Sequence, residues 1–242
     1  MNRTIIITGA TSGIGTYLSH YYGKKGYTLF LHGRDKRKLD KLRTELSNPN
    51  ASYLRADFTS PRDLQNMFTA ISKKAKKVDV LINNAFGKLE DPIDKADPAA
   101  IITFFQVSLA GTAEIIRRSL PLLKKSKEAH IINIVADWGF PMHNIMTGPS
   151  LYIAAKYGVH GLGAALQTEV SKMGIRTTNV CPGIVAADTR HDTTEKSFEK
   201  AHGAEAIHPM DIAHTIDYVL DQRYSHVRTI ILSPVNPNYN GL

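Results

Sequence analysis

Short runs of β-branched and other apolar residues alternate with longer helical segments along this chain, and that alternation restricts the fold most. The first strand is expected over Arg3–Thr8, where the isoleucines Ile5–Ile7 follow one another without an intervening polar residue. An unbroken apolar run is typical of a parallel strand that helices cover on both faces. The sequence therefore predicts an α/β fold, a single doubly wound parallel sheet of the Rossmann type with helices on both faces.

The other predicted elements continue this alternation. Further strands are expected over Thr28–His32, Ser52–Arg55, Val78–Ile82, His130–Val135, Arg176–Val180 and Arg228–Leu232. Helices are expected over Gly13–Lys25, Lys36–Leu46, Pro61–Lys74, Pro98–Leu120 (with a small-residue break at Ala110-Gly111), Leu151–Met173 and Pro209–Leu220. Because no linker rich in Pro, Gly or Ser divides the series, we expect residues 1–242 to form one domain. The long connection over 184–208 has few apolar residues, and we interpret it as a substrate lid.

Charge and cysteine content narrow the functional classes. The formal net charge is +8, but the basic residues are scattered, and the densest cluster, the lysines between positions 73 and 77, contains no aromatic residue. Base stacking needs aromatic side chains, so we expect no nucleic-acid partner. The single cysteine, Cys181, excludes an intrachain disulfide and a four-cysteine zinc site. We expect no metal site, because His191, His202 and His208 are irregularly spaced.

Apolar runs in the chain are short. The longest candidates, such as Ile5–Ile7 and Ile131–Val135, fall far below the roughly 20 residues of a membrane-spanning helix. Thr8-Gly9 follows the first of these runs at once, so the N-terminus lacks the apolar segment of a signal peptide. We therefore expect a cytoplasmic protein without a membrane partner.

A glycine-rich turn, Thr8-Gly9-Ala10-Thr11-Ser12-Gly13-Ile14-Gly15, lies between the first strand and the first helix. Glycines let the backbone turn sharply and approach a pyrophosphate closely, and the helix N-terminus offers N–H groups and the positive end of its dipole. The context of strand, turn and helix makes this motif more specific than glycines alone. The residues expected to contact a dinucleotide here are Gly9, Thr11, Ser12, Gly13, Ile14 and Gly15.

The order of the motifs resembles that of the classical short-chain dehydrogenase/reductase family. The turn has the spacing T-G-x-x-x-G-x-G, Asp57 follows the third strand, and Asn83-Asn84-Ala85 follows the fourth. Tyr152 and Lys156 come after the fifth strand, and Pro182-Gly183 after the sixth. The resemblance covers nearly the whole chain and implies an oxidoreductase that transfers hydride between a nicotinamide and a carbonyl or alcohol substrate. It also implies cofactor contacts from Asp57, Asn84, Lys156, Pro182 and Gly183.

The residues after the second strand favour NADP(H) over NAD(H). An acidic residue at the end of this strand would accept a hydrogen bond from a free ribose 2′-hydroxyl, whereas this chain reads His32-Gly33-Arg34-Asp35. The family's NADP-preferring members have a similar basic residue, and Arg34 could hold the 2′-phosphate. We interpret Asp35 as the cap of the following helix.

The pattern Y-x-x-x-K occurs twice, as Tyr21/Lys25 and as Tyr152/Lys156. The first pair fits a surface position in the opening helix. The second starts a helix where the family has its catalytic pair, and residues four apart share one helix face. An ammonium group beside a phenol favours phenolate, so we expect Lys156 to lower the pKa of Tyr152. In the family the tyrosine donates a proton to the carbonyl oxygen and the lysine also holds the nicotinamide ribose.

Three positions depart from the family pattern. Ala136 stands where the catalytic serine is usual, Ser108 replaces an asparagine, and Phe86 replaces a glycine. Loss of a polar group from a reacting oxygen typically lowers the rate by about 10²–10³. The role of the missing serine could be taken by Asp137, His143 or Asn144, or by a group of the substrate itself. Each of the three side chains could also be an ordinary polar loop residue.

The sequence gives less direct information about the substrate and the oligomeric state than about the cofactor. Apolar residues before Tyr152 would suit a substrate with an apolar or aromatic part: Trp138, Phe140, Met142, Ile145 and Met146. The helix over Leu151–Val170 is rich in Ala and Gly and pairs with its own copy in the family, which favours a homodimer or homotetramer. Two other functions remain open: a nucleotide-binding sensor or interaction subunit with little redox activity, and non-redox chemistry such as dehydration at the same site.

Overall fold

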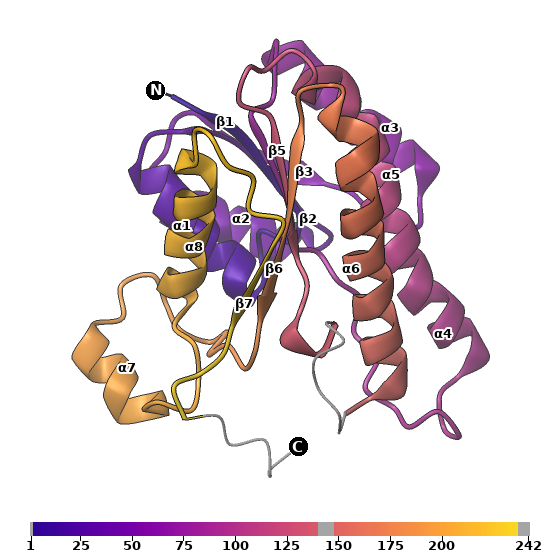
Figure 1. Ribbon diagram of the computed structural model, residues 1–242, viewed down its shortest axis with the longest axis vertical. Coiled ribbons are helices and arrows are strands. Elements are labelled where there is room, and N and C mark those ends of the chain that lie inside the picture. Colours follow the sequence, from indigo (N-terminus) through magenta and orange to yellow (C-terminus); the bar gives the residue numbers. More distant parts are fainter. Residues whose placement is uncertain (1, 140–147, 237–242) are drawn as a thin grey trace.

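The computed structural model describes residues 2–139 and 148–236. Within them, seven parallel strands form one sheet in the order β3-β2-β1-β4-β5-β6-β7 (Figure 1). The strands are β1 (Thr4–Ile7), β2 (Thr28–Gly33), β3 (Ala51–Arg55), β4 (Val80–Asn83), β5 (His130–Ile134), β6 (Arg176–Pro182) and β7 (Thr229–Leu232). The Rossmann-type α/β prediction is confirmed, and the strand order reverses between β1 and β4, where such folds bind their ligands.

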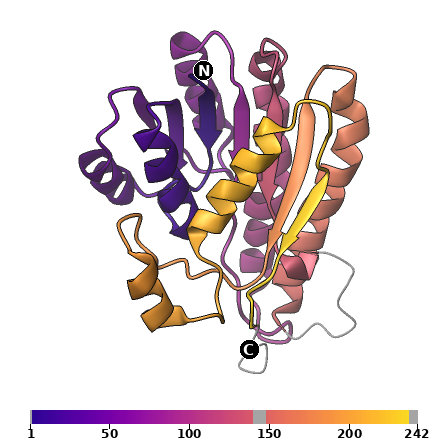
Figure 2. The same ribbon diagram turned by 60° about the vertical axis from the view of Figure 1, so that its left-hand side comes forward.

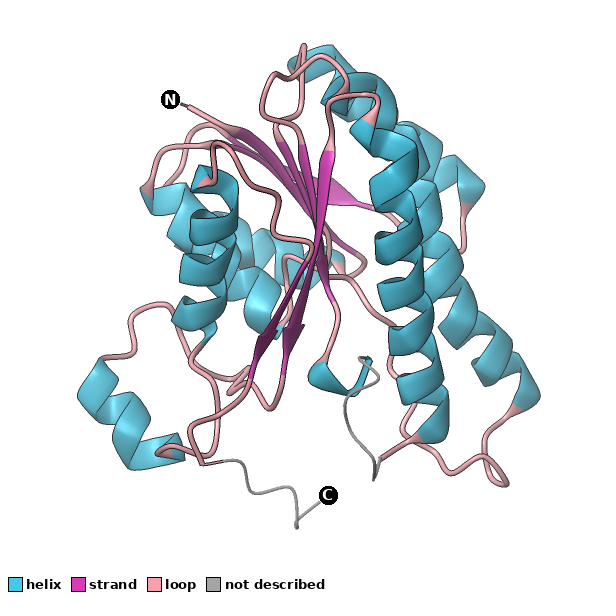
Figure 3. Ribbon diagram, in the orientation of Figure 1, coloured by secondary structure: helices cyan, strands magenta, loops and turns pink. Residues whose placement is uncertain are grey.

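Helices cover both faces of the sheet (Figure 3). One core cluster joins α1, α2 and α8 to the sheet, and a second cluster joins α3, α5 and α6 to its other face. The bounds of these helices are α1 (Gly13–Lys24), α2 (Lys36–Glu45), α3 (Pro61–Lys74), α5 (Gly111–Leu123), α6 (Ser150–Ser171) and α8 (Pro209–Asp221). In β1, Ile5 and Ile7 belong to the first cluster and Ile6 to the second, and all three are fully buried. Burial on both sides explains why this run does not alternate with polar residues.

The predicted break at Ala110-Gly111 is a π-helical turn inside a longer helix. Helix α4 (Pro98–Phe105) continues through Gln106–Ala110 directly into α5, with no interruption of the helical path. By length and composition alone, the joined helix Pro98–Leu123 could span a membrane. The sequence analysis did not identify this segment, because it considered only the shorter apolar runs. In the fold, this helix packs on β4, α3 and α6.

The connection after β6 contains a helix that the sequence analysis missed. Helix α7 (Glu195–His202) lies apart from the main layers, beyond the start of α8 (Figure 2). Thr194 caps it by accepting a hydrogen bond from the Ser197 N–H at 3.2 Å. The base of the connection is closed by a parallel bridge between Val185 and Ile207. The capping threonine was the available signal, since threonine is a preferred N-cap residue.

Several expected side chains of the substrate region lie outside the described residues. They are Phe140, Met142, His143, Asn144, Ile145 and Met146. In residues 2–139 and 148–236, no three side chains of His, Cys, Asp or Glu form a group that could hold a metal ion.

Candidate active site

Two glycines give the turn after β1 its shape. Gly9 has a φ of +65°, and a Cβ built on it would lie 2.8 Å from Ala85 Cα. A Cβ on Gly15 would lie 2.1 Å from the Gly9 carbonyl oxygen. Neither position can carry a side chain without displacing backbone, because contacts this short do not occur between real atoms. Thr11, Ser12, Gly13 and Ile14 complete the turn and open α1, as the sequence predicts.

The start of α1 is built differently from those of α2, α3 and α4. Each of those three helices is capped by a side chain, from Asp35, Ser60 and Asp97 respectively. At α1 the N-cap residue is Ser12, whose hydroxyl donates to Gly9 O at 3.1 Å and makes no cap hydrogen bond. The first turn of α1 also contains no acidic residue. The backbone N–H groups at the start of α1 therefore suit a phosphate group. A phosphate could accept their hydrogen bonds, and its negative charge would face the positive end of the helix dipole.

Asn84 fastens the loop after β4 to this turn. Its Nδ2 donates to Thr8 O at 3.2 Å and to Gly9 O at 3.1 Å. The backbone N–H groups of Asn84 and Ala85 both donate to Thr8 Oγ1 at 3.0 Å. The structure thus gives the Asn84 side chain a role in fixing the turn that the sequence did not reveal.

Arg34 and Asp57 come together at the ends of β2 and β3. Arg34 is exposed directly after β2, and Asp57 Oδ1 accepts hydrogen bonds from Thr59 N at 2.8 Å and from Thr59 Oγ1 at 2.7 Å. Burial opposes the charged carboxylate, but the Thr59 hydrogen bonds and the charges of Arg34 and Arg55 lower the pKa of Asp57 below its usual value. Asp35 caps α2, as predicted, by accepting from the N–H groups of two following residues.

Tyr152 and Lys156 lie in the first two turns of α6. The Lys156 side chain is buried, and its Nζ donates to Ile134 O at 3.3 Å. The same ammonium lies 3.9 Å from the ring centroid of Phe86 and 5.6 Å from that of Tyr152. The Phe86 and Tyr152 rings are in edge contact, with centroids 5.4 Å apart. Phe86, noted in the sequence only as a departure, therefore contacts both residues of the pair.

The pKa of Tyr152 shifts in the direction opposite to the expected one. Burial, reinforced by the negative charge of Asp137, raises the pKa of Tyr152 to about 12. Burial lowers the pKa of Lys156 to about 7, although Cys181 weakly opposes that change. Desolvation disfavours the charged form of each group and is the largest cause of both shifts. The Tyr152 phenol therefore keeps its proton at neutral pH.

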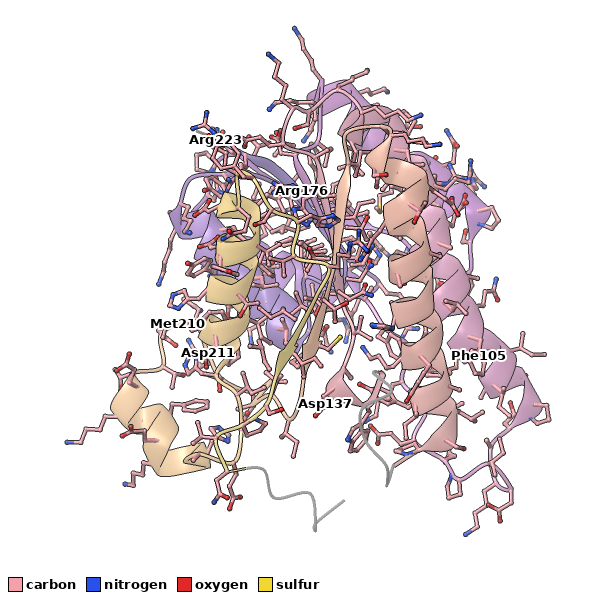
Figure 4. All side chains as sticks on the ribbon, in the orientation of Figure 1. Phe105, Asp137, Arg176, Met210, Asp211 and Arg223 are labelled. Atoms are coloured by element: carbon pink, nitrogen blue, oxygen red, sulfur yellow. The ribbon has the colours of Figure 1, made fainter. Side chains whose placement is uncertain are left out.

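Asp137 occupies a buried position beside the pair. It starts a short 3₁₀ turn, Asp137–Gly139, directly after Ala136 at the end of β5, and is 3% exposed. Its Oδ1 accepts from Trp138 N at 2.7 Å, and a Cβ on Gly183 would lie 2.9 Å from its Oδ2. Figure 4 places it at the carboxyl edge of the sheet, at the end opposite Arg176. Asp137 is therefore within electrostatic reach of Tyr152, which the sequence could not establish.

Other residues that the sequence analysis singled out form hydrogen bonds or ion pairs within the fold. Ser108 is fully buried in the π-helical turn, and its Oγ accepts from Gly87 N at 3.0 Å. Pro182 ends β6, and Gly183 N donates to Leu232 O at 2.8 Å, next to Asp137. Tyr21 and Lys25, the other Y-x-x-x-K pair, both bind Asp217 of α8. That pair connects two helices and lies apart from the strand ends.

Comparison with known proteins agrees with this geometry. The seven-stranded parallel sheet with helices on both faces defines a class, the Rossmann-type α/β proteins. The family model described as short chain dehydrogenase matches residues 3–197. The chain belongs to the short-chain dehydrogenase family.

Relatives span the whole chain. An uncharacterized oxidoreductase of Staphylococcus saprophyticus is 28% identical over 97% of this chain and 98% of its own length. An alcohol dehydrogenase from the archaeon Thermococcus sibiricus, complexed with 5-hydroxy-NADP, is similar in fold with a TM-score of 0.81 and 21% identity, covering 99% of this chain and 100% of its own. A 3-ketoacyl-(acyl-carrier-protein) reductase from Brucella melitensis, complexed with NADH, has the same TM-score at 21% identity and covers 96% of this chain and 97% of its own.

Proposed function

We propose that the protein is an NADP(H)-dependent oxidoreductase that transfers hydride reversibly between the nicotinamide and a carbonyl or alcohol substrate. The observation that carries this proposal is the position of Tyr152 and Lys156 in α6, beside the end of β5 and at the same edge of the parallel sheet as the glycine-rich turn. The residues proposed to hold the cofactor are Gly9, Thr11, Ser12, Gly13, Ile14, Gly15, Arg34, Asp57, Asn84, Lys156, Pro182 and Gly183. When bound, the nicotinamide supplies or accepts the hydride.

Tyr152 is the proposed general acid. Its phenol donates a proton to the carbonyl oxygen as that oxygen gains negative charge, and protonated Lys156 stabilises the resulting phenolate. Because burial raises the pKa of Tyr152 to about 12, the phenol holds its proton at neutral pH, as a general acid for carbonyl reduction requires.

Cofactor preference provides the first test. We expect NADPH to bind at least about tenfold more tightly than NADH, since a charge-assisted phosphate contact readily supplies about 1.4 kcal/mol. Arg34→Ala should remove most of the preference, whereas Arg43→Ala, farther along α2 and 5.0 Å from the Tyr53 ring, should leave it intact. Fluorescence titration of both cofactors measures this, and equal affinities in the wild-type protein would contradict the proposal.

Ala136 provides a second test. We expect Ala136→Ser to raise kcat/KM for an activated ketone several-fold, since a preorganised donor beside the reacting oxygen is worth about 2–4 kcal/mol. Asp137→Asn should be measured beside it, because Asp137 is the described residue that could take over the missing role. A lower rate in Ala136→Ser would show that the small side chain makes room for substrate, and an unchanged rate in Asp137→Asn would exclude Asp137 as the substitute.

The substrate is proposed to be a small molecule with an apolar or aromatic part. Phe86 lies beside Tyr152, and its ring is also in edge contact with Phe104 at 5.6 Å. The 184–208 segment is the proposed lid, because Ala187 contacts the turn at Gly13, where a Cβ would lie 2.9 Å from Ala187 Cβ. We further propose a homodimer or homotetramer in the cytoplasm, without a nucleic-acid or membrane partner.

A nucleotide sensor is the second candidate. The observations that favour it are Ala136 in place of a donor and the engagement of the Ser108 hydroxyl by Gly87 N–H. Tight NADPH binding without turnover of any ketone or alcohol in a substrate panel would support this candidate over the enzyme. Conversion of a substrate without any consumption of NADPH would instead point to non-redox chemistry.

A further inference from the structure

His32, near the end of β2, makes three hydrogen bonds that connect separate parts of the cofactor region. Gly9 N–H donates to its Nδ1 at 3.3 Å, and Ala10 N–H donates to its main-chain oxygen at 2.8 Å. On the other side of the ring, Nε2 lies 3.1 Å from Ala56 O. One residue thus contacts both the start of the glycine-rich turn and the residue before Asp57.

These partners fix the protonation of the imidazole. Gly9 N–H can only donate, so Nδ1 must accept, and Ala56 O can only accept, so Nε2 must carry the proton. Burial lowers the pKa of His32 to about 4, against the opposing effects of Ala56 and Asp57, so the ring is neutral at neutral pH. His32 is 4% exposed, and its ring stacks on Phe58, with centroids 4.5 Å apart and planes at 16°. Each ring nitrogen therefore has one defined role.

We propose that His32 is a positioning residue of the cofactor site, which orients the peptide between Thr8 and Gly9 at the start of the glycine-rich turn. Gly9 has a left-handed conformation. In the peptide between Thr8 and Gly9, the Thr8 carbonyl accepts a hydrogen bond from Asn84 Nδ2, and the Gly9 N–H is the second polar group that orients this peptide. The inference rests on the proposed use of a nicotinamide dinucleotide.

Two substitutions distinguish the contributions of the two ring nitrogens of His32. His32→Asn retains an acceptor near the Nδ1 position, whereas His32→Gln retains a donor near the Nε2 position, and both lose the stack on Phe58. We expect His32→Gln to weaken NADPH binding about tenfold. The hydrogen bond from Gly9 N–H to the ring is lost, and this N–H is then left without an acceptor. We expect His32→Asn to stay within about threefold of the wild-type Kd. Fluorescence titration measures both constants, and thermal unfolding checks that the two variants are equally stable.

Amide hydrogen exchange at Gly9 gives a readout that needs no cofactor. With glycine labelled by ¹⁵N, we expect slow exchange in the wild-type protein and in His32→Asn, and fast exchange in His32→Gln. Fast exchange at Gly9 in the wild-type protein would overturn the proposal even if neither variant folds. Equal losses of NADPH affinity in the two variants would also overturn it. If the wild-type protein exchanges slowly at Gly9 but binds no nicotinamide dinucleotide, the proposed function fails while the hydrogen bond stands.

Discussion

Tyr152→Phe is expected to lower kcat for ketone reduction by a factor of about 100 or more, while the Kd for NADPH changes little. The reason is that the phenol supplies the proton, and a general acid in this position typically contributes about 10²–10⁴ in rate. Phenylalanine keeps the ring that contacts Phe86, with centroids 5.4 Å apart in the wild-type protein, so packing should be preserved. Steady-state kinetics with an activated ketone, beside a fluorescence titration of NADPH, provides the measurement.

The matched control is Tyr157→Phe, one position after Lys156 on the same helix. It removes a phenol of the same size from α6 without touching the proposed site, so kcat should stay near the wild-type value. Full activity of Tyr152→Phe would show that another group donates the proton and that the functional assignment of this pair is wrong.

Lys156 is expected to make the reduction rate sensitive to pH near neutrality. Because burial lowers its pKa to about 7, the ammonium loses its proton above that pH and no longer stabilises the Tyr152 phenolate. We expect kcat/KM to fall about tenfold for each pH unit above 7, as for a single essential proton. Lys156→Met should abolish this dependence together with nearly all of the activity. Lys172→Met, at the exposed end of α6, should leave the pH profile unchanged.

The same buried lysine should reduce stability. Its pKa is lower in the folded than in the unfolded chain, so the unfolded chain binds more protons between about pH 7 and 10.5, and wild-type stability rises with pH across that window. At pH 6 we expect Lys156→Met to unfold with a free energy higher by up to about 5 kcal/mol, since one pKa unit corresponds to about 1.4 kcal/mol. The difference should shrink toward pH 10. Urea unfolding at both pH values measures it, and a variant less stable at pH 6 would contradict the lowered pKa.

The fold was accessible from sequence because local patterns and tertiary packing agree. The isoleucines of β1, the cap at Asp35 and the Ser60-Pro61 start of α3 each act over a few residues, and the structure confirms them. Helix α7 was missed because its burial depends on Phe198 alone, which packs on His208 across the segment. A single apolar residue produces no periodic signal.

The chemistry of the site was harder to predict from the sequence than the fold. Sequence spacing places Tyr152 and Lys156 on one helix face, but it carries no information about how much water reaches them. The direction of the Tyr152 pKa depends on burial and on Asp137, which enters from β5. Likewise, the contact between His32 and Gly9 joins two strands and a turn, so only the folded chain shows it.

The bridge between Val185 and Ile207 holds the two ends of the 184–208 segment together at its base. Backbone hydrogen bonds from Ala186 N to Ile207 O, at 3.1 Å, and from Ile207 N to Ile184 O, at 2.8 Å, reinforce this closure. The intervening residues thus leave and re-enter the fold at nearly one point. Under the proposal that this segment is the substrate lid, we expect that residues 188–205 can be exchanged as one unit to alter substrate selection while the sheet beneath stays the same.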